Sequence, residues 1–375
     1  MKARTLFSVL LGFMCVTTRA DSPTYELSLT ADAEVSVPIG QTNEIYVLKS
    51  DSNYTLTKLG AGALLIGRVD SSRVRLNVLE GELLIATPTC PAVFADAVFH
   101  VDAAQTNTFV LAAGSDGIER WNDCHGGTVY AKQDKTNVGT WRTDAASRYA
   151  QLVLGAQNGL PLVDFGTLQN ASAASGTGTA LAFSQDITGI REAIAVYGFT
   201  DEFYTGTAGS PTAVFGYTAS AGCAFMPGGF DVTSPLSMNP KLLNVYQPCT
   251  VQSRNGVFVD GVSVKGASVY PAGLHVIEYH IDEPAADATD YGTANNFARE
   301  RSFSFGGIQL GEAAFFTRPL TDDEHEQVRK YLDLKWFSSG IPSTDRISVA
   351  PGAHARIRRG LDWEEIVAGD KGTIQ

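Results

Sequence analysis

The chain has 375 residues, of which 44% are hydrophobic and 18% charged, and its formal net charge at pH 7 is −12. This composition excludes an intrinsically disordered chain, which would carry fewer apolar and more charged residues. The negative charge argues against a nucleic-acid-binding protein, because an acidic surface repels the phosphate backbone.

Residues 1–20 have the features of a secretory signal peptide. Lys2 and Arg4 supply the positive start, residues 6–16 are almost continuously apolar, and residues 18–20 (Thr-Arg-Ala) place small side chains where a signal peptidase reads. The apolar run is too short for an ordinary transmembrane segment, and no later run is long enough. We therefore expect an exported protein that is extracellular or bound to the cell surface, with the periplasm as an alternative.

Residues 21–92 predict a first unit made of short strands. Residues 44–48 and 73–79 alternate apolar and polar side chains, and residues 63–66 (Ala-Leu-Leu-Ile) are continuously apolar, as in a strand buried on both faces. Glycines punctuate these runs, which indicates tight turns between them.

A glycine-rich segment of this unit resembles the autotransporter-associated β-strand repeat. Residues 58–64 (Lys-Leu-Gly-Ala-Gly-Ala-Leu) match its Lys-x-Gly-x-Gly-x-Leu core, and residues 81–83 (Gly-Glu-Leu) match its later Gly-x-Leu strand. The resemblance covers residues 56–85 and implies rungs of a parallel β-helix. One rung cannot bury its own faces, so we expect it to stack on neighbouring strands.

Residues 93–340 contain four motifs whose order is informative. They are Val101-Asp102-Ala103, a turn made by Trp121 with Asp123 and Gly126, residues 158–165 (Asn-Gly-Leu-Pro-Leu-Val-Asp-Phe), and the segment 320–336. This order resembles the concanavalin A-like, laminin-G-type domains of bacterial exported proteins. The resemblance implies an all-β fold, an antiparallel two-sheet jelly-roll sandwich with one C-terminal helix.

The residues between these motifs independently predict antiparallel strands. Apolar or alternating runs recur with turn residues between them. They are residues 193–199, 242–246, 274–281, 302–305 and 313–316. Residues 255–264 predict a hairpin, in which Asp260-Gly261 supplies the positive φ angles of a tight turn.

The segment 320–336 predicts a capped helix. Thr321 can cap the helix, and Glu324, three residues later, completes a capping box. An apolar stripe at helical spacing follows, formed by Val328, Tyr331, Leu332 and Trp336. Residues 341–375 form a tail, in which residues 347–357 alternate like half of a β-helix rung. We expect this tail to pack as a strand on the first unit, with an irregular cap as the alternative.

One face of the strand at residues 274–282 carries the candidate chemistry. Because side chains alternate along a strand, Glu278, His280 and Asp282 share one side. They could bind a ligand, or Glu278 and Asp282 could act as acid and base in sugar hydrolysis. Related sandwich hydrolases use Glu-x-Asp-x-x-Glu, and Glu278-x-x-x-Asp282-Glu283 departs from that pattern. The alternative is a solvent-facing sheet surface with hydrated acids.

Aromatic residues supply a second kind of candidate. Trp141 lies among polar residues and could present an exposed ring to a sugar, so it joins the predicted ligand-binding set. Trp121 and Trp336 match packing positions of the resembling family, and we expect them in the core.

Calcium is the possible cofactor, and no other is expected. Such sandwiches often carry it, and calcium prefers oxygen ligands. Two groups of acids and amides could supply them, although turn chemistry also enriches loops in these residues. The groups are Asp102, Asp116, Asn122 and Asp123, and Asp282, Asp287, Asp290, Asn295 and Asn296.

Four cysteines remain after residues 1–20, an even number that is compatible with two disulfides in an exported protein. Closeness in sequence favours Cys223 with Cys249 and Cys90 with Cys124, although four cysteines allow three pairings. A zinc site is the alternative, but no C-x-x-C or H-x-x-x-H spacing supports it.

These observations predict an exported, non-catalytic carbohydrate- or protein-binding adhesion protein. One alternative is a glycan-active hydrolase or lyase that uses Glu278 with Asp282 or Glu283. Another is a purely structural surface or matrix component. A serine hydrolase is disfavoured because the chain has no Gly-x-Ser-x-Gly elbow.

Overall fold

The computed structural model describes much of the chain. The described residues are 8–10, 13–15, 24–69, 73–86, 90–134, 148–167, 169–170, 178–200, 215–216, 229–230, 238–239, 242–243, 257–264, 268–269, 273–280, 292–300, 304–337, 346–359 and 362–366. They form strands, two short 3-10 segments, η1 (Ala92–Asp96) and η2 (Thr106–Thr108), and one described α-helix, α2 (Asp322–Trp336). The predicted all-β class is therefore confirmed.

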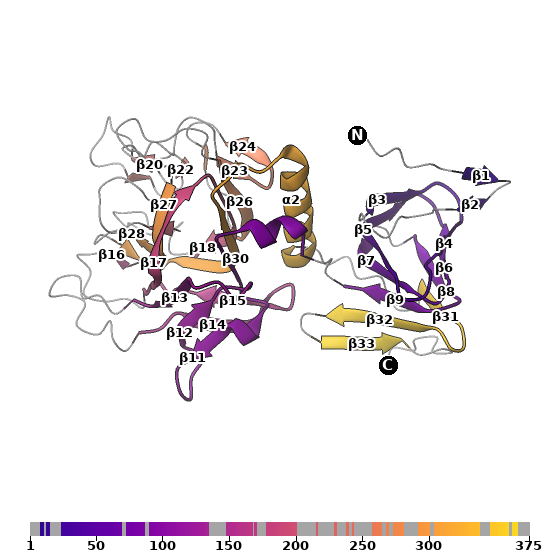
Figure 1. Cartoon of the computed structure of the whole chain (residues 1–375), viewed down its shortest axis with the longest axis horizontal. Coiled ribbons are helices and arrows are strands. Elements are labelled where there is room, and N and C mark those ends of the chain that lie inside the picture. The colour runs from indigo at the N-terminus through magenta and orange to yellow at the C-terminus, as the bar shows by residue number, and fades with distance from the viewer. Residues whose placement is uncertain are drawn as a thin grey trace. The chain divides into compact units, whose positions relative to one another are not determined.

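The chain divides into two compact units (Figure 1). The first unit comprises residues 1–91 and 326–375, and the second unit comprises residues 92–325. No helix among the described residues has both the length and the hydrophobicity needed to cross a membrane.

The first unit is built from two sheets between which the chain alternates. The strands of one sheet are β1 (Ser8–Leu10), β2 (Phe13–Cys15), β4 (Ala33–Ser36), β6 (Thr55–Leu59), β8 (Arg75–Val78) and β31 (Ile347–Val349). Those of the other are β3 (Thr24–Leu29), β5 (Thr42–Ser50), β7 (Ala63–Val69), β9 (Glu82–Ile85), β32 (His354–Arg359) and β33 (Asp362–Ile366).

In both sheets the strands follow the order just given. The pairs from β2 to β31 and from β3 to β32 are parallel, whereas β1 and β33 pair antiparallel at the ends. Each successive pair of strands therefore adds one layer to the stack, as in a solenoid. The strands β31 and β32 follow the helix in sequence but extend the same two sheets.

An aliphatic core fills the first unit. Both sheets contribute to it, for example Ile45 and Ile66 from one and Val78 from the other. Ile347 and Ile357, which come after the helix, are buried in the same cluster. The alternation of apolar side chains thus places one face of each strand inward.

Lys58 is a buried cation that holds turns of the stack together. Its Nζ atom donates hydrogen bonds to the carbonyl oxygens of Leu59 (2.9 Å), Gly60 (2.6 Å) and Glu80 (3.1 Å). Because Glu80 lies in the next layer, the lysine of the Lys-x-Gly-x-Gly motif connects two successive turns.

The glycines of the motif lie where successive turns come close together. A Cβ atom on Gly60 would lie 2.4 Å from the carbonyl oxygen of Val37, and one on Gly62 would lie 2.1 Å from that of Pro38. Gly81 has a φ of +67° and repeats the same close approach one layer later, 2.4 Å from the oxygen of Gly62. Only glycine fits at these positions without displacing backbone.

Residues 1–20, predicted to be a signal peptide, contain β1 and β2. These strands pair with each other, and β2 pairs in parallel with β4. Cleavage of a leader stays a prediction.

The second unit contains two larger sheets. The strands of the first, in spatial order, are β14 (Gln151–Gln157), β15 (Leu160–Asp164), β30 (Ile308–Phe316), β18 (Glu192–Phe199), β26 (His275–His280), β23 (Val257–Val259) and β24 (Val262–Val264), and β10 (Phe99–Asp102) also pairs with β30. Those of the second are β11 (Phe109–Leu111), β12 (Ile118–Asn122), β13 (Tyr130–Gln133), β17 (Leu181–Ile190), β27 (Gly292–Phe297) and β19 (Phe215–Gly216).

All described pairings in these two sheets are antiparallel. Shorter antiparallel ladders complete the unit. They are β16 (Gln169–Asn170) with β29 (Ser304–Phe305) and β28 (Arg299–Glu300), β20 (Gly229–Phe230) with β21 (Met238–Asn239), and β22 (Leu242–Leu243) with β25 (Ser268–Val269).

The two large sheets pack face to face through aromatic side chains. Phe99 and Phe315 of the first sheet contact Phe183 of the second, with ring centroids 5.2 and 6.0 Å apart. Phe215 of the second sheet lies 4.8 Å from Phe315. Trp121 is fully buried in this unit, which confirms its predicted packing role. Aromatic side chains bury large apolar areas, so they contribute much of the stability of such a core.

Local sequence signals are confirmed at two places. The backbone N–H of Thr321 donates to Oε2 of Glu324 (2.8 Å), and that of Glu324 donates to Oγ1 of Thr321 (3.3 Å), so the capping box forms at the start of α2. Asp260 and Gly261 both have positive φ, 49° and 77°, and they join β23 to β24 as the predicted hairpin. Trp336, at the end of α2, is fully buried as predicted.

Candidate functional site

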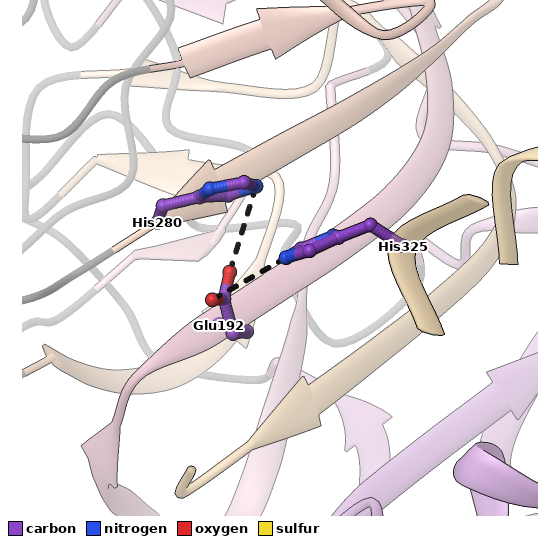
Figure 2. Close-up of side chains that lie close together, drawn as sticks. All are labelled: Glu192, His280 and His325. Atoms are coloured by element: carbon purple, nitrogen blue, oxygen red, sulfur yellow. Dashed lines mark ion pairs between the residues drawn. The ribbon is translucent and has the colours of Figure 1, made fainter. Parts of the chain in front are cut away.

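Four ionisable side chains meet on one face of the larger sheet in the second unit. Glu192 begins β18, Glu278 and His280 lie on the adjacent β26, and His325 lies in the first turn of α2. Figure 2 shows Glu192, His280 and His325 pointing toward one another. We call these four residues the Glu–His cluster.

Strand register places the Glu–His cluster on the face away from the aromatic core. Glu192 lies opposite His280 in the antiparallel ladder, and its neighbour Ala193 lies opposite Tyr279. Tyr279 contacts Phe215 of the second sheet, so its side chain points into the space between the sheets. Because side chains alternate, Glu278 and His280 point to the opposite face.

The distances define a compact arrangement of two carboxylates and two imidazoles. Nδ1 of His325 lies 2.8 Å from Oε2 of Glu278, and its Nε2 lies 3.6 Å from Oε1 of Glu192. Nε2 of His280 lies 3.7 Å from Oε2 of Glu192 and 3.5 Å from Oε2 of Glu278. Each imidazole therefore faces both carboxylates.

The Glu–His cluster is buried. The side chains of Glu278, Glu192 and His325 are 1%, 3% and 5% exposed, and that of His280 is 18% exposed. The ring of His280 stacks between that of Phe258 (4.4 Å) and that of His325 (4.3 Å). Two carboxylates in such a place require positive charge, because removing an unpaired charge from water costs several kcal/mol.

The pKa of His325 shows one source of that charge. Burial acts to lower this pKa, and the hydrogen bonds and negative charges of Glu192 and Glu278 act to raise it. The carboxylates prevail and raise the pKa of His325 to about 9. A proton on His325 therefore balances part of the buried negative charge at neutral pH.

A second buried pair lies on the same face. Nε2 of His100, on β10, lies 2.9 Å from Oε1 of Glu312, on β30, and Nδ1 of His100 lies 3.0 Å from Nε2 of His125. Register aligns His100, Ala314, Ile194 and Glu278 in one row across β10, β30, β18 and β26. This face of the sheet thus carries polar groups at both ends of an apolar row.

The structure corrects one interpretation of the predicted site. Glu278 and His280 do share a face and meet in the Glu–His cluster. The interpretation of this face as solvent-exposed, with hydrated acids, is wrong for Glu278, because the start of α2 covers it with His325. Asp282, Glu283 and Trp141 lie outside the described residues.

Two of the acids predicted as calcium ligands cap turns. Oδ1 of Asp102 accepts the backbone N–H of Ala104 (2.9 Å). The carboxylate of Asp123 accepts the backbone N–H groups of His100 (2.8 Å), His125 (2.7 Å) and Gly127 (3.1 Å). The contacts with Ala104, His125 and Gly127 are those of turn chemistry, and the contact with His100 joins the turn to β10. Calcium stays a prediction, and Asp282, Asp287 and Asp290 lie outside the described residues.

Of the two predicted disulfides, the structure describes the cysteines of only one. Cys90 belongs to the first unit and Cys124 to the second, and both side chains are half-buried. A disulfide between them stays a prediction. Cys223 and Cys249 lie outside the described residues.

Sequence reasoning missed Glu192 and His325. Glu192 opens a strand whose other residues are all buried, so a charge there is a signal of a buried pair. His325 precedes Val328, Leu332 and Trp336 at helical spacing and therefore continues the apolar stripe of α2. A polar residue within an apolar pattern is the signal that could have identified both.

Comparison with known proteins identifies no relative. No family model, no curated protein and no solved structure matches the chain. Function must therefore be inferred from the geometry of the chain itself.

Proposed function

We propose that this chain is an exported, non-catalytic binding or adhesion protein. Its second unit is a concanavalin A-like jelly-roll sandwich that presents the binding surface, and the parallel stack of the first unit holds or spaces it. The predicted signal peptide at residues 1–20 supports export. Two antiparallel sheets packed face to face and a helix that follows the last strand support the sandwich.

The observation that carries this proposal is an exposed apolar edge on the second unit. β14 is the last strand of its sheet, and Val153 and Leu154 on it are 39% and 66% exposed. On β11, the last strand of the other sheet, Val110 and Leu111 are also exposed. The segment at Gly117–Ile118 pairs with both strands, so these side chains lie on neighbouring edges.

Aliphatic side chains that gather at exposed strand edges mark a candidate interaction surface. Apolar side chains at such an edge add contact area for a partner. Sugar recognition relies more on aromatic rings and polar groups. The edge formed by Val110, Leu111, Val153 and Leu154 therefore favours a protein partner over a carbohydrate.

The catalytic alternative is disfavoured by the burial of Glu278. A glycoside hydrolase needs two carboxylates that flank the bond to be cleaved. Glu278 is 1% exposed and in contact with His325, so a glycan cannot reach its carboxylate without movement of α2. This geometry supports a structural role for Glu278.

The test combines binding and turnover. The mature chain is exposed to a panel of immobilised glycans and extracellular proteins, with binding measured by interferometry and product release by chromatography. We expect saturable binding without turnover, weakened about 10-fold in a Val153→Lys/Leu154→Lys variant, because buried aliphatic contacts of this size are worth one to two kcal/mol. Ile39→Lys, at an exposed position of the first unit, is the matched control.

Two results would overturn the proposal. Product release that disappears in Glu278→Gln would establish an enzyme. Absence of binding together with self-assembly, seen by light scattering, would establish a structural surface component.

A further inference from the structure

The geometry points to a metal site: we propose that Glu192, His280 and His325 bind a zinc ion. The inference does not depend on the binding role proposed above. The three residues come from β18, β26 and α2, and their ligand atoms all lie within 4.8 Å of one another. Figure 2 shows the ring of His325 directed at the carboxylate of Glu192 and the ring of His280, seen edge-on, close to the same carboxylate.

The separations match those between ligands of one ion. Zinc binds histidine nitrogen and carboxylate oxygen at about 2.0–2.1 Å in tetrahedral geometry, which sets neighbouring donor atoms about 3.4 Å apart. Oε1 of Glu192 lies 3.6 Å from Nε2 of His325, and its Oε2 lies 3.7 Å from Nε2 of His280. The two imidazole rings are stacked with 19° between their planes, so binding requires them to tilt until both lone pairs converge.

Two of the ligand atoms make no hydrogen bond within the described part of the chain. Oε2 of Glu192 and Nε2 of His280 are both buried without such a contact. Buried polar atoms are almost always hydrogen-bonded or bound to an ion, because removing them from water without a partner is unfavourable. A zinc ion between them would bind both atoms, and its charge of +2 would balance the carboxylates of Glu192 and Glu278.

The surroundings already orient the ligands. Oε2 of Glu278 lies 2.8 Å from Nδ1 of His325 and favours a proton on that atom, so zinc would displace the proton on Nε2 and bind there. The backbone N–H of Leu320 lies 3.4 Å from Oε1 of Glu192, and Phe258 stacks on the outer face of His280. A histidine that binds zinc usually donates its other ring N–H to a carboxylate, a backbone carbonyl or a water molecule.

The donor set selects zinc over calcium. Two imidazoles and one carboxylate suit a borderline-soft ion, whereas calcium requires six or more oxygen ligands. With three protein ligands, a fourth position remains for water, next to the partly exposed His280. The alternative occupant of the Glu–His cluster is a proton shared with the carboxylates, and the experiment separates the two.

The experiment uses the full chain, stripped with a chelator and dialysed against metal-free buffer. Zinc is added in the presence of a chromophoric competitor, and thermal unfolding is followed with and without zinc. We expect one tightly bound ion per chain and a rise in the midpoint of unfolding of about 5 °C at saturation. Calcium and magnesium at the same concentration should produce neither effect.

Substitutions of the proposed ligands test whether the zinc ion binds at these residues. His280→Gln and Glu192→Gln should each weaken zinc binding about 100-fold or more, since each removes one of three protein ligands. His354→Gln changes a histidine that is 62% exposed in the first unit, and it should leave the affinity unchanged. Circular dichroism verifies that each variant folds.

If a variant fails to fold, X-ray absorption at the zinc edge of the unmodified chain still decides. We expect two imidazoles in the ligand set, with no sulfur. Absence of stoichiometric zinc, sulfur ligation, or affinity that is unchanged in folded His280→Gln and Glu192→Gln would each overturn the proposal and leave the cluster as a set of proton-balanced ion pairs.

Discussion

Nδ1 of His325, in the first turn of α2, lies 2.8 Å from Oε2 of Glu278, in the middle of β26. Both side chains are buried, so this contact joins a helix to a sheet through opposite charges rather than through apolar packing. A charged pair of this kind contributes little net stability when complete, but breaking it is costly because the remaining charge stays buried.

Glu278→Gln should lower the free energy of unfolding by about 2 kcal/mol. Glutamine keeps an acceptor for His325 but removes one of the two negative charges that face it. Urea denaturation in the presence of a chelator measures the effect. Glu119→Gln, at an exposed position of β12, is the control and should change stability by less than about 0.5 kcal/mol. If Glu278→Gln and Glu119→Gln had equal stability, the negative charge of Glu278 would not contribute to the stability of the fold.

Acid should weaken the start of α2 over a defined range of pH. The hydrogen bond from Arg318 lowers the pKa of Glu324 from 4.5 to about 2, assisted by the backbone and hydroxyl of Thr321, although burial opposes the shift. Because the folded-state pKa is depressed, the stabilisation is present above pH 4.5 and is lost as the pH falls toward 2.

The comparison with Glu324→Gln isolates this effect, since glutamine preserves the capping box. We expect the unmodified chain to be more stable than Glu324→Gln by about 1 kcal/mol at pH 6, and we expect this difference to disappear near pH 2. If the stability of both proteins changed equally with pH, the loss of stability in acid would not arise from Glu324.

Lys58→Met should destabilise the first unit by about 2 kcal/mol. The change keeps the aliphatic stem but leaves the carbonyl oxygens of Leu59, Gly60 and Glu80 without their common donor. Hydrogen exchange should increase in β6 to β9. Lys49→Met, which removes an exposed ion pair with Glu26, is the control, and it should cost less than about 1 kcal/mol.

Gly81→Ala should disrupt the stack more than Gly40→Ala. Both glycines have positive φ, +67° and +77°, so both substitutions strain the backbone by about 1 kcal/mol. At Gly81 the new Cβ would also lie 2.4 Å from the carbonyl oxygen of Gly62, whereas at Gly40 no atom lies within 4 Å. We expect the midpoint of thermal unfolding to fall for Gly81→Ala by at least twice as much. If both substitutions lowered the midpoint equally, the close approach between Gly81 and Gly62 would not limit the size of the side chain at position 81.

Export should remove residues 1–20. The pattern of Lys2, Arg4, the apolar run and the small residues before Asp21 predicts cleavage after Ala20. Mass spectrometry of the exported chain should therefore find Asp21 at the N-terminus. An exported chain that retains Met1 would show that β1 and β2 belong to the mature fold.

The sequence by itself determined the features that depend on residues close together in the chain. The capping box of Thr321 and Glu324 and the tight turn at Asp260-Gly261 form as predicted, because each arises from local hydrogen bonds or backbone angles. Alternation likewise placed Glu278 and His280 on one side of their strand.

Only the tertiary structure decided what that side faces. Alternation says which side chains share a face of a strand, but it cannot say whether solvent or another element covers the face. The register of β18 against β26 places Glu192 opposite His280, and α2 places His325 over both. Pairing between segments so distant in the chain depends on the whole sheet, and it turns a predicted surface of hydrated acids into a buried cluster of carboxylates and imidazoles.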